Sequence, residues 1–136
     1  MGDVLVGGGP VTPFGQKIRV LRARRAITLK TMAGDLGVSS AYLSALEHGN
    51  RGRPGPGLIM QICGYFDLIW DEAEELKRLA ELSHPRVVVD TAGLSPRATE
   101  LANLLARNIG DLDEDTIDWV LAEIRGRMVP KKGPTH

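Results

Sequence analysis

The sequence predicts a mainly α-helical protein, in which five N-terminal helices precede one short strand and two C-terminal helices. Three observations predict this class. Apolar residues recur at helical spacing through most of the chain. Hydroxyl residues and glycines stand where helices would begin and end. Valine-rich sequence suited to a strand occurs only at residues 86–91. We expect a flexible tail at 1–12, a five-helix domain at 13–84, a C-terminal segment at 85–128 and a disordered tail at 129–136.

The composition is ordinary for a globular protein, with 43% apolar and 25% charged residues. The N-terminus lacks the charged and apolar regions of a signal peptide, and no run of 18 apolar residues occurs. We therefore expect a cytoplasmic protein without a membrane span. The single Cys63 excludes an internal disulfide, and its apolar neighbours indicate a core thiol.

The first expected helix begins at Thr12-Pro13, since a hydroxyl cap followed by proline is a common helix start. Phe14, Ile18 and Leu21 recur at spacings that place them on its inner face. Basic residues occupy the remaining surface and are candidates for phosphate contacts. They are Lys17, Arg22, Arg24 and Arg25.

Two short helices separated by a tight turn are predicted between Thr28 and Gly49. Thr28 is positioned to cap the first, over 29–36, and Ser39 to cap the second. Gly37 stands at the turn between them, where a left-handed backbone conformation costs glycine little. Gly49 ends the second helix. The stretch therefore predicts a helix, a tight turn and a helix.

The second of these helices has two different faces. Leu43 and Leu46 fall on one side, with Tyr42 and Glu47 at its margins. The opposite stripe carries small side chains and an imidazole instead of long charged ones, so it can approach another surface closely. A helix in the DNA major groove needs this property. The stripe consists of Ala41, Ser44, Ala45 and His48.

The residues from Ala33 to Ser39, with Tyr42-Leu43-Ser44, Leu46-Glu47 and Gly49, resemble the phage-repressor-like (Xre, Cro-like) helix-turn-helix regulators over about 14–70. The resemblance implies a five-helix DNA-binding domain whose second motif helix is the recognition helix. The family often has glutamine or arginine at places held here by Leu29, Ser40 and Ala45. We therefore expect base discrimination to depend on DNA shape or on other elements.

The charge distribution agrees with a DNA partner although the net charge is zero. Residues 13–57 hold eight basic and two acidic residues, a balance of +6, whereas residues 58–136 hold nine basic and fourteen acidic, a balance of −5. Attraction to phosphate depends on the local field, so a basic N-terminal half suits DNA.

A glycine- and proline-rich loop at 50–57 carries Arg51 and Arg53 directly after the expected recognition helix. Two more helices are expected beyond it, one buried from Leu58 and one over 71–83.

The C-terminal segment combines the strand at 86–91 with helices beginning at Ser95 and at Asp113, separated by Gly110. Such a small segment needs a partner for its apolar side chains, which is the first domain, a second subunit, or both. The strand, likewise, needs either a copy of itself or the domain surface. We expect the dimer interface to include Val87, Val88, Val89, Leu101, Leu105, Val120, Leu121 and Ile124.

The sequence shows no catalytic, metal or cofactor site. Its histidines, His48, His84 and His136, are scattered, and no nucleophile lies in a recognisable motif. We therefore expect no enzyme activity, no cofactor and no metal.

We interpret the chain as a homodimeric transcriptional repressor that is associated with the nucleoid and binds double-stranded DNA. Two alternatives remain: an antitoxin that autoregulates its promoter and binds a protein partner through its C-terminal region, and a protein-interaction module that has lost DNA binding. The expected DNA-binding residues are Lys17, Arg22, Arg24, Arg25, Thr28, Lys30, Ser39, Ser40, Ala41, Tyr42, Ser44, His48, Asn50, Arg51 and Arg53.

Overall fold

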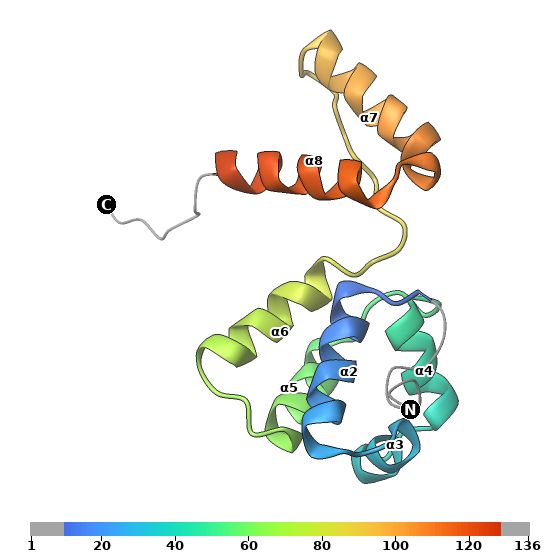
Figure 1. Cartoon of the computed structure of the whole chain (residues 1–136), viewed down its shortest axis with the longest axis vertical. Helices are drawn as coiled ribbons and strands as arrows, with labels where there is room; N and C mark the ends of the chain where they lie inside the picture. Colours follow the sequence, from blue (N-terminus) through green and yellow to red (C-terminus); the bar gives the residue numbers. More distant parts are fainter. Residues whose placement is uncertain (1–9, 129–136) are drawn as a thin grey trace. The chain divides into compact units, whose positions relative to one another are not determined.

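The computed structural model describes residues 10–128, which form seven α-helices and one short 3-10 helix. The chain divides after Val87 into two compact units (Figure 1). The first contains α2 (Pro13–Arg25), α3 (Leu29–Leu36), α4 (Ser40–His48), α5 (Pro56–Tyr65) and α6 (Asp71–Glu81). The second contains α7 (Pro96–Asn108), the 3-10 helix η1 (Ile109–Asp111) and α8 (Glu114–Arg127). The predicted mainly α class is confirmed. The expected tails at 1–12 and 129–136 lie outside the described residues, apart from residues 10–12.

The predicted helix starts are confirmed by their cap hydrogen bonds. Thr12 accepts from the backbone N–H of Gly15, and Thr28 accepts from that of Thr31, both at 3.0 Å. Ser39 likewise caps α4. Each cap satisfies one of the backbone donors that a helix N-terminus leaves without an intrahelical partner.

The tight turn between α3 and α4 is also confirmed. Gly37 adopts φ 75°, in the left-handed region that favours glycine. The N–H groups of Gly37 and Val38 return to the carbonyls of Gly34 and Ala33, at 3.2 and 3.0 Å. These bonds satisfy the end of α3 while the chain reverses into α4.

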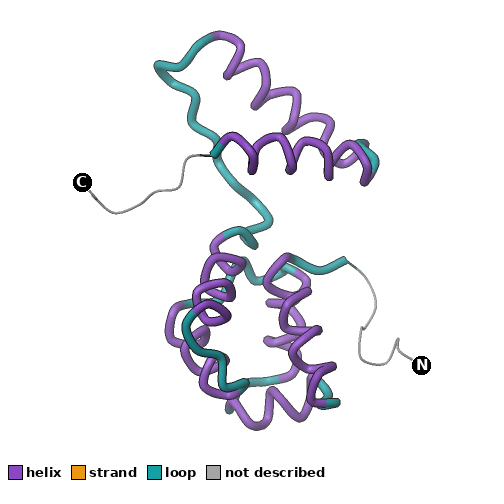
Figure 2. Tube along the Cα trace, turned by 60° about the vertical axis from the view of Figure 1, so that its left-hand side comes forward, coloured by secondary structure: helices purple, strands orange, loops and turns teal. Residues whose placement is uncertain are grey.

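The five helices of the first unit pack together (Figure 2) and share one apolar core. Helix α2 contacts both α4 and α6, while α3 packs on α4 and α5. The inner face predicted for α2 is confirmed, because Phe14, Ile18 and Leu21 are buried. Core side chains from the other helices include Met32, Leu43, Leu46, Ile62, Cys63 and Leu76.

The predicted strand at residues 86–91 is wrong. No residue between 10 and 128 lies in a strand, and the segment is an extended connection. Val87, Val88 and Val89 are 73%, 95% and 64% exposed. Valine favours strands only when a neighbouring strand accepts its backbone hydrogen bonds and covers its side chain, and the described chain offers no such neighbour.

Helix α5 starts slightly earlier than expected. The alternation of glycine and proline predicted a loop through residue 57, but α5 begins at Pro56 with Gly55 as its N-cap. Proline is well suited to the first helical position because its missing N–H has no partner there in any case.

The second unit has no buried residue in α7, η1 or α8. Ser95 and Asp113 cap α7 and α8 as the sequence predicts, and α7 ends just before Gly110. The local sequence signals therefore predict the starts of these helices correctly, although their described residues form no buried core.

Candidate nucleic-acid interface

Helix α4 presents short side chains on the face that the sequence predicts for DNA. Ala41 is exposed, and Ser44, Ala45 and His48 are partly exposed. The opposite face is anchored in the core by Leu43, which is fully buried. An exposed stripe without long side chains allows a helix backbone to approach the base edges of a major groove.

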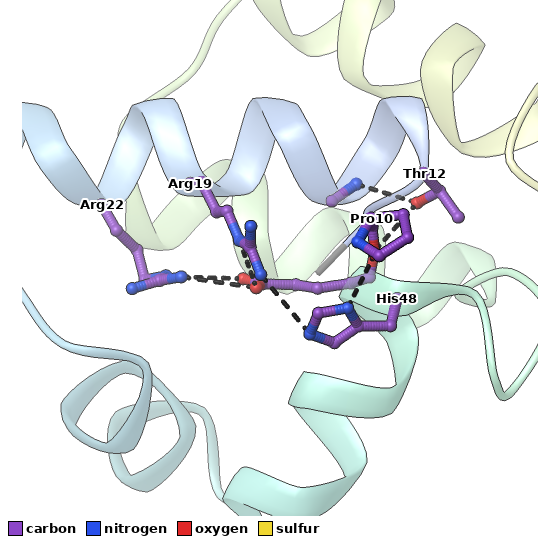
Figure 3. A network of polar contacts seen from close by, with 7 residues as sticks. Pro10, Thr12, Arg19, Arg22 and His48 are labelled. Carbon is purple, nitrogen blue, oxygen red and sulfur yellow. Dashed lines mark hydrogen bonds and ion pairs between the residues drawn. The ribbon is translucent and has the colours of Figure 1, made fainter. Parts of the chain in front are cut away.

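The carboxylate of Glu47 fixes α4 to α2. Its side chain is 2% exposed and accepts from Arg22 at 3.2 Å and from Arg19 at 3.3 Å (Figure 3). The sequence interpretation placed Arg22 on the outer surface, and this is wrong, since Arg22 is 4% exposed. The acid in α4 accounts for its burial, because a buried charge requires a partner of opposite sign.

Sequence reasoning missed both Arg19 and Glu47 as members of the site. A usable signal was present. Arg19 and Arg22 lie three residues apart on one helix face, and Glu47 borders the apolar face of α4. An acid at the edge of a buried face, with two spaced cations on another helix, indicates a buried ion pair.

Close backbone packing reinforces this anchor. The N–H of Thr12 donates to the carbonyl of Glu47 at 3.0 Å. A Cβ atom added to Gly15 would lie 2.2 Å from that carbonyl oxygen, so only glycine permits α2 to approach α4 this closely. The C-terminal end of α4 is therefore held by both main-chain and side-chain contacts.

His48 connects this network to the chain ahead of α2. Its Nδ1 lies 2.8 Å from the carbonyl of Pro10, and its Nε2 lies 3.4 Å from Nη2 of Arg19 (Figure 3). The carbonyl can only accept and the guanidinium can only donate, so in this arrangement Nδ1 donates to Pro10 and Nε2 accepts from Arg19. Residue 10 is thereby tied to the C-terminal turn of α4.

Three of the cations expected to contact phosphate are paired with acids on the far side of α2. Lys17 lies 3.3 Å from Glu75, and Arg24 lies 3.1 Å from Glu72. The hydrogen bond from Arg24, aided by the charge of Lys17, lowers the pKa of Glu72. This face of α2 packs against α6.

Arg25, the third of these cations, is similarly occupied. It donates to the carbonyl of Tyr65 at 2.8 Å, pairs with Asp67 at 3.0 Å and stacks over Phe66. The assignment of Lys17, Arg24 and Arg25 to DNA contacts stays a prediction, but each of the three already has an acidic partner.

Other cations lie beside α4 without a described acidic partner. Arg51 stacks its guanidinium over the ring of Tyr42, 5.5 Å from the ring centroid. This contact ties the loop after α4 to the helix. Arg53 is exposed further along the loop, Asn50 is exposed at its start, and Lys30 is exposed in the first turn of α3. Lys30 before α4 and Arg51 and Arg53 after it therefore add positive charge to the segments that flank this helix in the sequence.

The expected dimer residues lie in both units. Leu101, Leu121 and Ile124 are 60%, 39% and 51% exposed, while Leu105 and Val120 are partly covered. Val87 ends the first unit, and Val88 and Val89 begin the second. These helical residues are therefore apolar side chains that are exposed or only partly covered.

The remaining chemistry of the described part of the chain is limited. Between residues 10 and 128, no three His, Cys, Asp or Glu side chains come together as potential metal ligands. No helix in that range is both long enough and apolar enough to span a bilayer. Burial raises the pKa of the Cys63 thiol, which makes it a weak nucleophile.

Comparison with known proteins agrees with this geometry. A family model described as "Helix-turn-helix domain" matches residues 13–82. The chain is 42% identical over 52 residues to the uncharacterized HTH-type transcriptional regulator RghRB of Bacillus subtilis (strain 168). These 52 residues cover 38% of this chain and 37% of the relative. It is 41% identical over 49 residues to the HTH-type transcriptional repressor RghR of the same organism, covering 36% of each protein.

The similarity therefore extends over little more than a third of these curated relatives. No solved structure matches the chain. The family match, in contrast, spans all five helices of the first unit. The chain belongs to the helix-turn-helix domain family, which confirms the family predicted from its motif.

Proposed function

We propose that this protein is a sequence-specific DNA-binding regulator of transcription that acts as a homodimeric repressor. The observation that carries the proposal is helix α4, whose exposed stripe of small side chains is held rigidly from behind by the buried pair of Glu47 and Arg22. Its family is a class of DNA-binding regulators and not of enzymes. One relative is named as a transcriptional repressor.

In this proposal α4 lies in the major groove. Ser40, Ala41 and Ser44 come closest to the base edges, because they occupy the exposed N-terminal part of the helix. Their side chains offer one hydroxyl hydrogen bond or a methyl contact and no bidentate pair, so each contributes little discrimination. Selectivity must therefore come also from DNA shape and from the adjoining loop.

Phosphate contacts come from the cations on either side of the motif, with Lys30 before α4 and Arg51 and Arg53 after it. Ser39 and Asn50, which are both exposed, add neutral donors, whereas the N–H of His48 is already donated to the carbonyl of Pro10. The hydroxyls of Thr28 and Ser39 both accept from a backbone N–H as helix caps, but the O–H of Thr28 donates to the hydroxyl of Thr31 at 3.0 Å, so only the O–H of Ser39 has no described acceptor. We do not include Lys17, Arg24 and Arg25, since their acidic partners lie toward α5 and α6.

The homodimer is supported by the second unit. Helices α7 and α8 bury no residue, yet they carry apolar stripes that include Leu101 and Leu105 on one and Leu121 and Ile124 on the other. A second copy would supply the missing apolar partner for both. Pairing also doubles the DNA contact, which brings a small helix-turn-helix unit to useful affinity.

The test begins with the purified full-length protein and fragments of its source genome. Bound fragments are sequenced, and affinity for the enriched site is measured by fluorescence anisotropy. Ala41→Glu should abolish binding through charge and bulk while the circular dichroism spectrum stays native. Gln61→Glu, which adds the same charge to an exposed position of α5, should retain binding.

Three results would contradict the proposal. Enrichment of no duplex at low salt would favour a protein-interaction module, and unchanged affinity of Ala41→Glu would remove α4 from the groove. A purified complex with a different protein through the second unit would favour the antitoxin interpretation over the homodimer. Repression itself is tested by a reporter gene placed under the enriched site, whose expression should fall when the protein is present.

A further inference from the structure

A cavity of about 630 Å³ lies beside the loop that follows α4. It is bounded by loop residues 53–55, by the start of α5 and by the C-terminal half of α6, all within the first unit. Its volume falls in the range of about 300–1,000 Å³ that is usual for small-molecule sites. Neither the core packing nor the proposed contact of α4 with DNA uses it.

The cavity is apolar on its inner side. Pro54 is buried and Ile59 is 8% exposed, whereas the neighbouring Met60 is 70% exposed. A methionine is flexible and polarisable, so it can close over an apolar guest of variable shape. Two prolines, Pro54 and Pro56, restrict the loop, which makes the wall largely preformed before any ligand arrives.

The rim of the cavity carries charge. Arg53 is exposed and has no side-chain hydrogen bond or ion pair within residues 10–128. Lys77 lies 3.2 Å from Glu74, but that pair is half exposed and can exchange its partner at little cost. Glu81 is the single acid on the lining. Two cations and one acid around an apolar floor favour a guest with one anionic end.

We propose that this cavity binds a small amphipathic carboxylate. The carboxylate would pair with the planar guanidinium of Arg53, which matches its geometry in two parallel hydrogen bonds. Lys77 adds a second cation, and the hydrocarbon part covers Pro54, Ile59 and Met60. The ligand would thereby remove apolar surface from water and neutralise an unpaired cation.

This site is coupled to the proposed function, on which the coupling rests. Arg53 follows the recognition helix and is one of the cations assigned to DNA. A guanidinium held by a carboxylate inside the cavity is unavailable to DNA, so ligand and DNA must weaken each other's binding by the same factor. The carboxylate would act as an inducer that releases the repressor.

Ligand binding is tested first on the full-length protein without DNA. Sodium octanoate is titrated while NMR follows the methionine methyl groups and the backbone amides. The methyl of Met60 and the amide of Gly55 should shift in a saturable manner, whereas the methyl of fully buried Met32 should not. Octanoate should bind more tightly than 1-octanol and octylammonium, because only the carboxylate complements Arg53.

Variants then test the charges. Arg53→Gln should weaken octanoate binding about tenfold, and Glu81→Gln should tighten it by removing the like charge. Arg51→Gln is the matched control, since that arginine stacks on Tyr42 and does not line the cavity, and it should leave octanoate binding unchanged. Absence of saturable shifts, equal binding of octylammonium, or an unchanged affinity of Arg53→Gln would overturn the proposal.

Coupling is measured last, by anisotropy with the enriched DNA site. Octanoate at nine times its dissociation constant should weaken DNA binding by about tenfold in the natural protein and not in Arg53→Gln. Octanoate binding without any effect on DNA affinity would overturn the inducer role. The titration without DNA gives its answer even if the protein binds no duplex, so failure of the two proposals can be told apart.

Discussion

The guanidinium of Arg22 lies 3.2 Å from Oε2 of Glu47, and both side chains are almost completely removed from solvent. The two residues are 25 positions apart and belong to α2 and α4. Arg22 Nε has no hydrogen-bond partner, so the pair is not fully satisfied. Removing a single partner from such a pair leaves a charge in the core without compensation.

We expect Arg22→Met to lower the free energy of unfolding by about 3 kcal/mol, at the lower end of the range for broken buried pairs, because Arg19 still contacts Glu47. Urea denaturation measures the change. Arg24→Met is the control, since it removes a half-exposed pair with Glu72 and should cost less than about 1 kcal/mol. Equal decreases in the free energy of unfolding for the two variants would show that the buried pair with Glu47 stabilises the fold no more than the half-exposed pair does.

The close approach of α2 and α4 leads to a second prediction. Gly15→Ala would place a methyl group 2.2 Å from a backbone carbonyl, where no flexible side chain can yield. We expect a loss of about 1–3 kcal/mol and weaker DNA binding, because α4 must shift to relieve the clash. Gly64→Ala is the matched helical control, with no atom within 4 Å of its added Cβ, and should be neutral or slightly stabilising. A fully stable Gly15→Ala variant with unchanged DNA affinity would argue against a tightly fixed α4.

The features predicted correctly from the sequence are those decided within a few residues. Thr12, Thr28 and Ser39 cap their helices because each bonds a backbone N–H three residues ahead, which requires no knowledge of the fold. Gly37 reverses the chain for an equally local reason. The features missed depend on contacts between distant segments. Arg22 looked like a surface cation until packing placed Glu47 beside it, and the valines at 87–89 required a strand partner that the described chain does not provide.

The candidate interface shows the same division. The exposed stripe of α4 follows from helical periodicity alone, so it was predictable. The ion pairs of Lys17 and Arg24 could not be predicted in this way. They form only because α6 packs on α2 and brings Glu72 and Glu75 opposite these two cations. Sequence distance gives no indication of such pairing, and basic residues near a motif are therefore only candidates until the opposite face is known.

The cations beside α4 should control the salt dependence of DNA binding. Arg51→Gln should weaken cognate and random DNA together and reduce the salt slope by about one unit, as expected for a lost phosphate contact. Arg24→Gln, with its partner on α6, should leave the slope unchanged. Anisotropy titrations at several salt concentrations measure both. A reduced slope for Arg24→Gln would show that its ion pair opens to DNA and would restore it to the interface.

The second unit should hold the dimer together through its apolar stripes. Ile124→Asp places a charge among them, and we expect a monomer by light scattering with weaker operator binding. Trp119→Asp is the control, because Trp119 projects about half a turn away from Ile124 on α8 and is itself 64% exposed. It should remain dimeric. If both variants stay dimeric, the subunits associate elsewhere.

Arg53 offers the sharpest test of how a recognition helix with short side chains achieves selectivity. It follows Gly52, which adopts φ 77°, and it is exposed without a described side-chain partner. A narrow, A·T-rich minor groove has enhanced negative potential that attracts arginine without base-edge hydrogen bonds. Arg53→Ala should therefore reduce the preference for operators with A·T flanks over those with G·C flanks by about 1–3 kcal/mol.

Two further variants separate this role from simple phosphate contact. Arg53→Lys should restore the preference only in part, because an ammonium group is more strongly hydrated than a guanidinium and loses more on entering a narrow groove. Arg51→Ala should weaken both operators equally, since its stacking on Tyr42 keeps it beside α4. Competition anisotropy with the two operators measures each preference. Equal losses on both operators for Arg53→Ala, fully recovered by lysine, would leave Arg53 as a phosphate contact, and selectivity would then have to come from the hydroxyls of α4 and from the deformability of the operator.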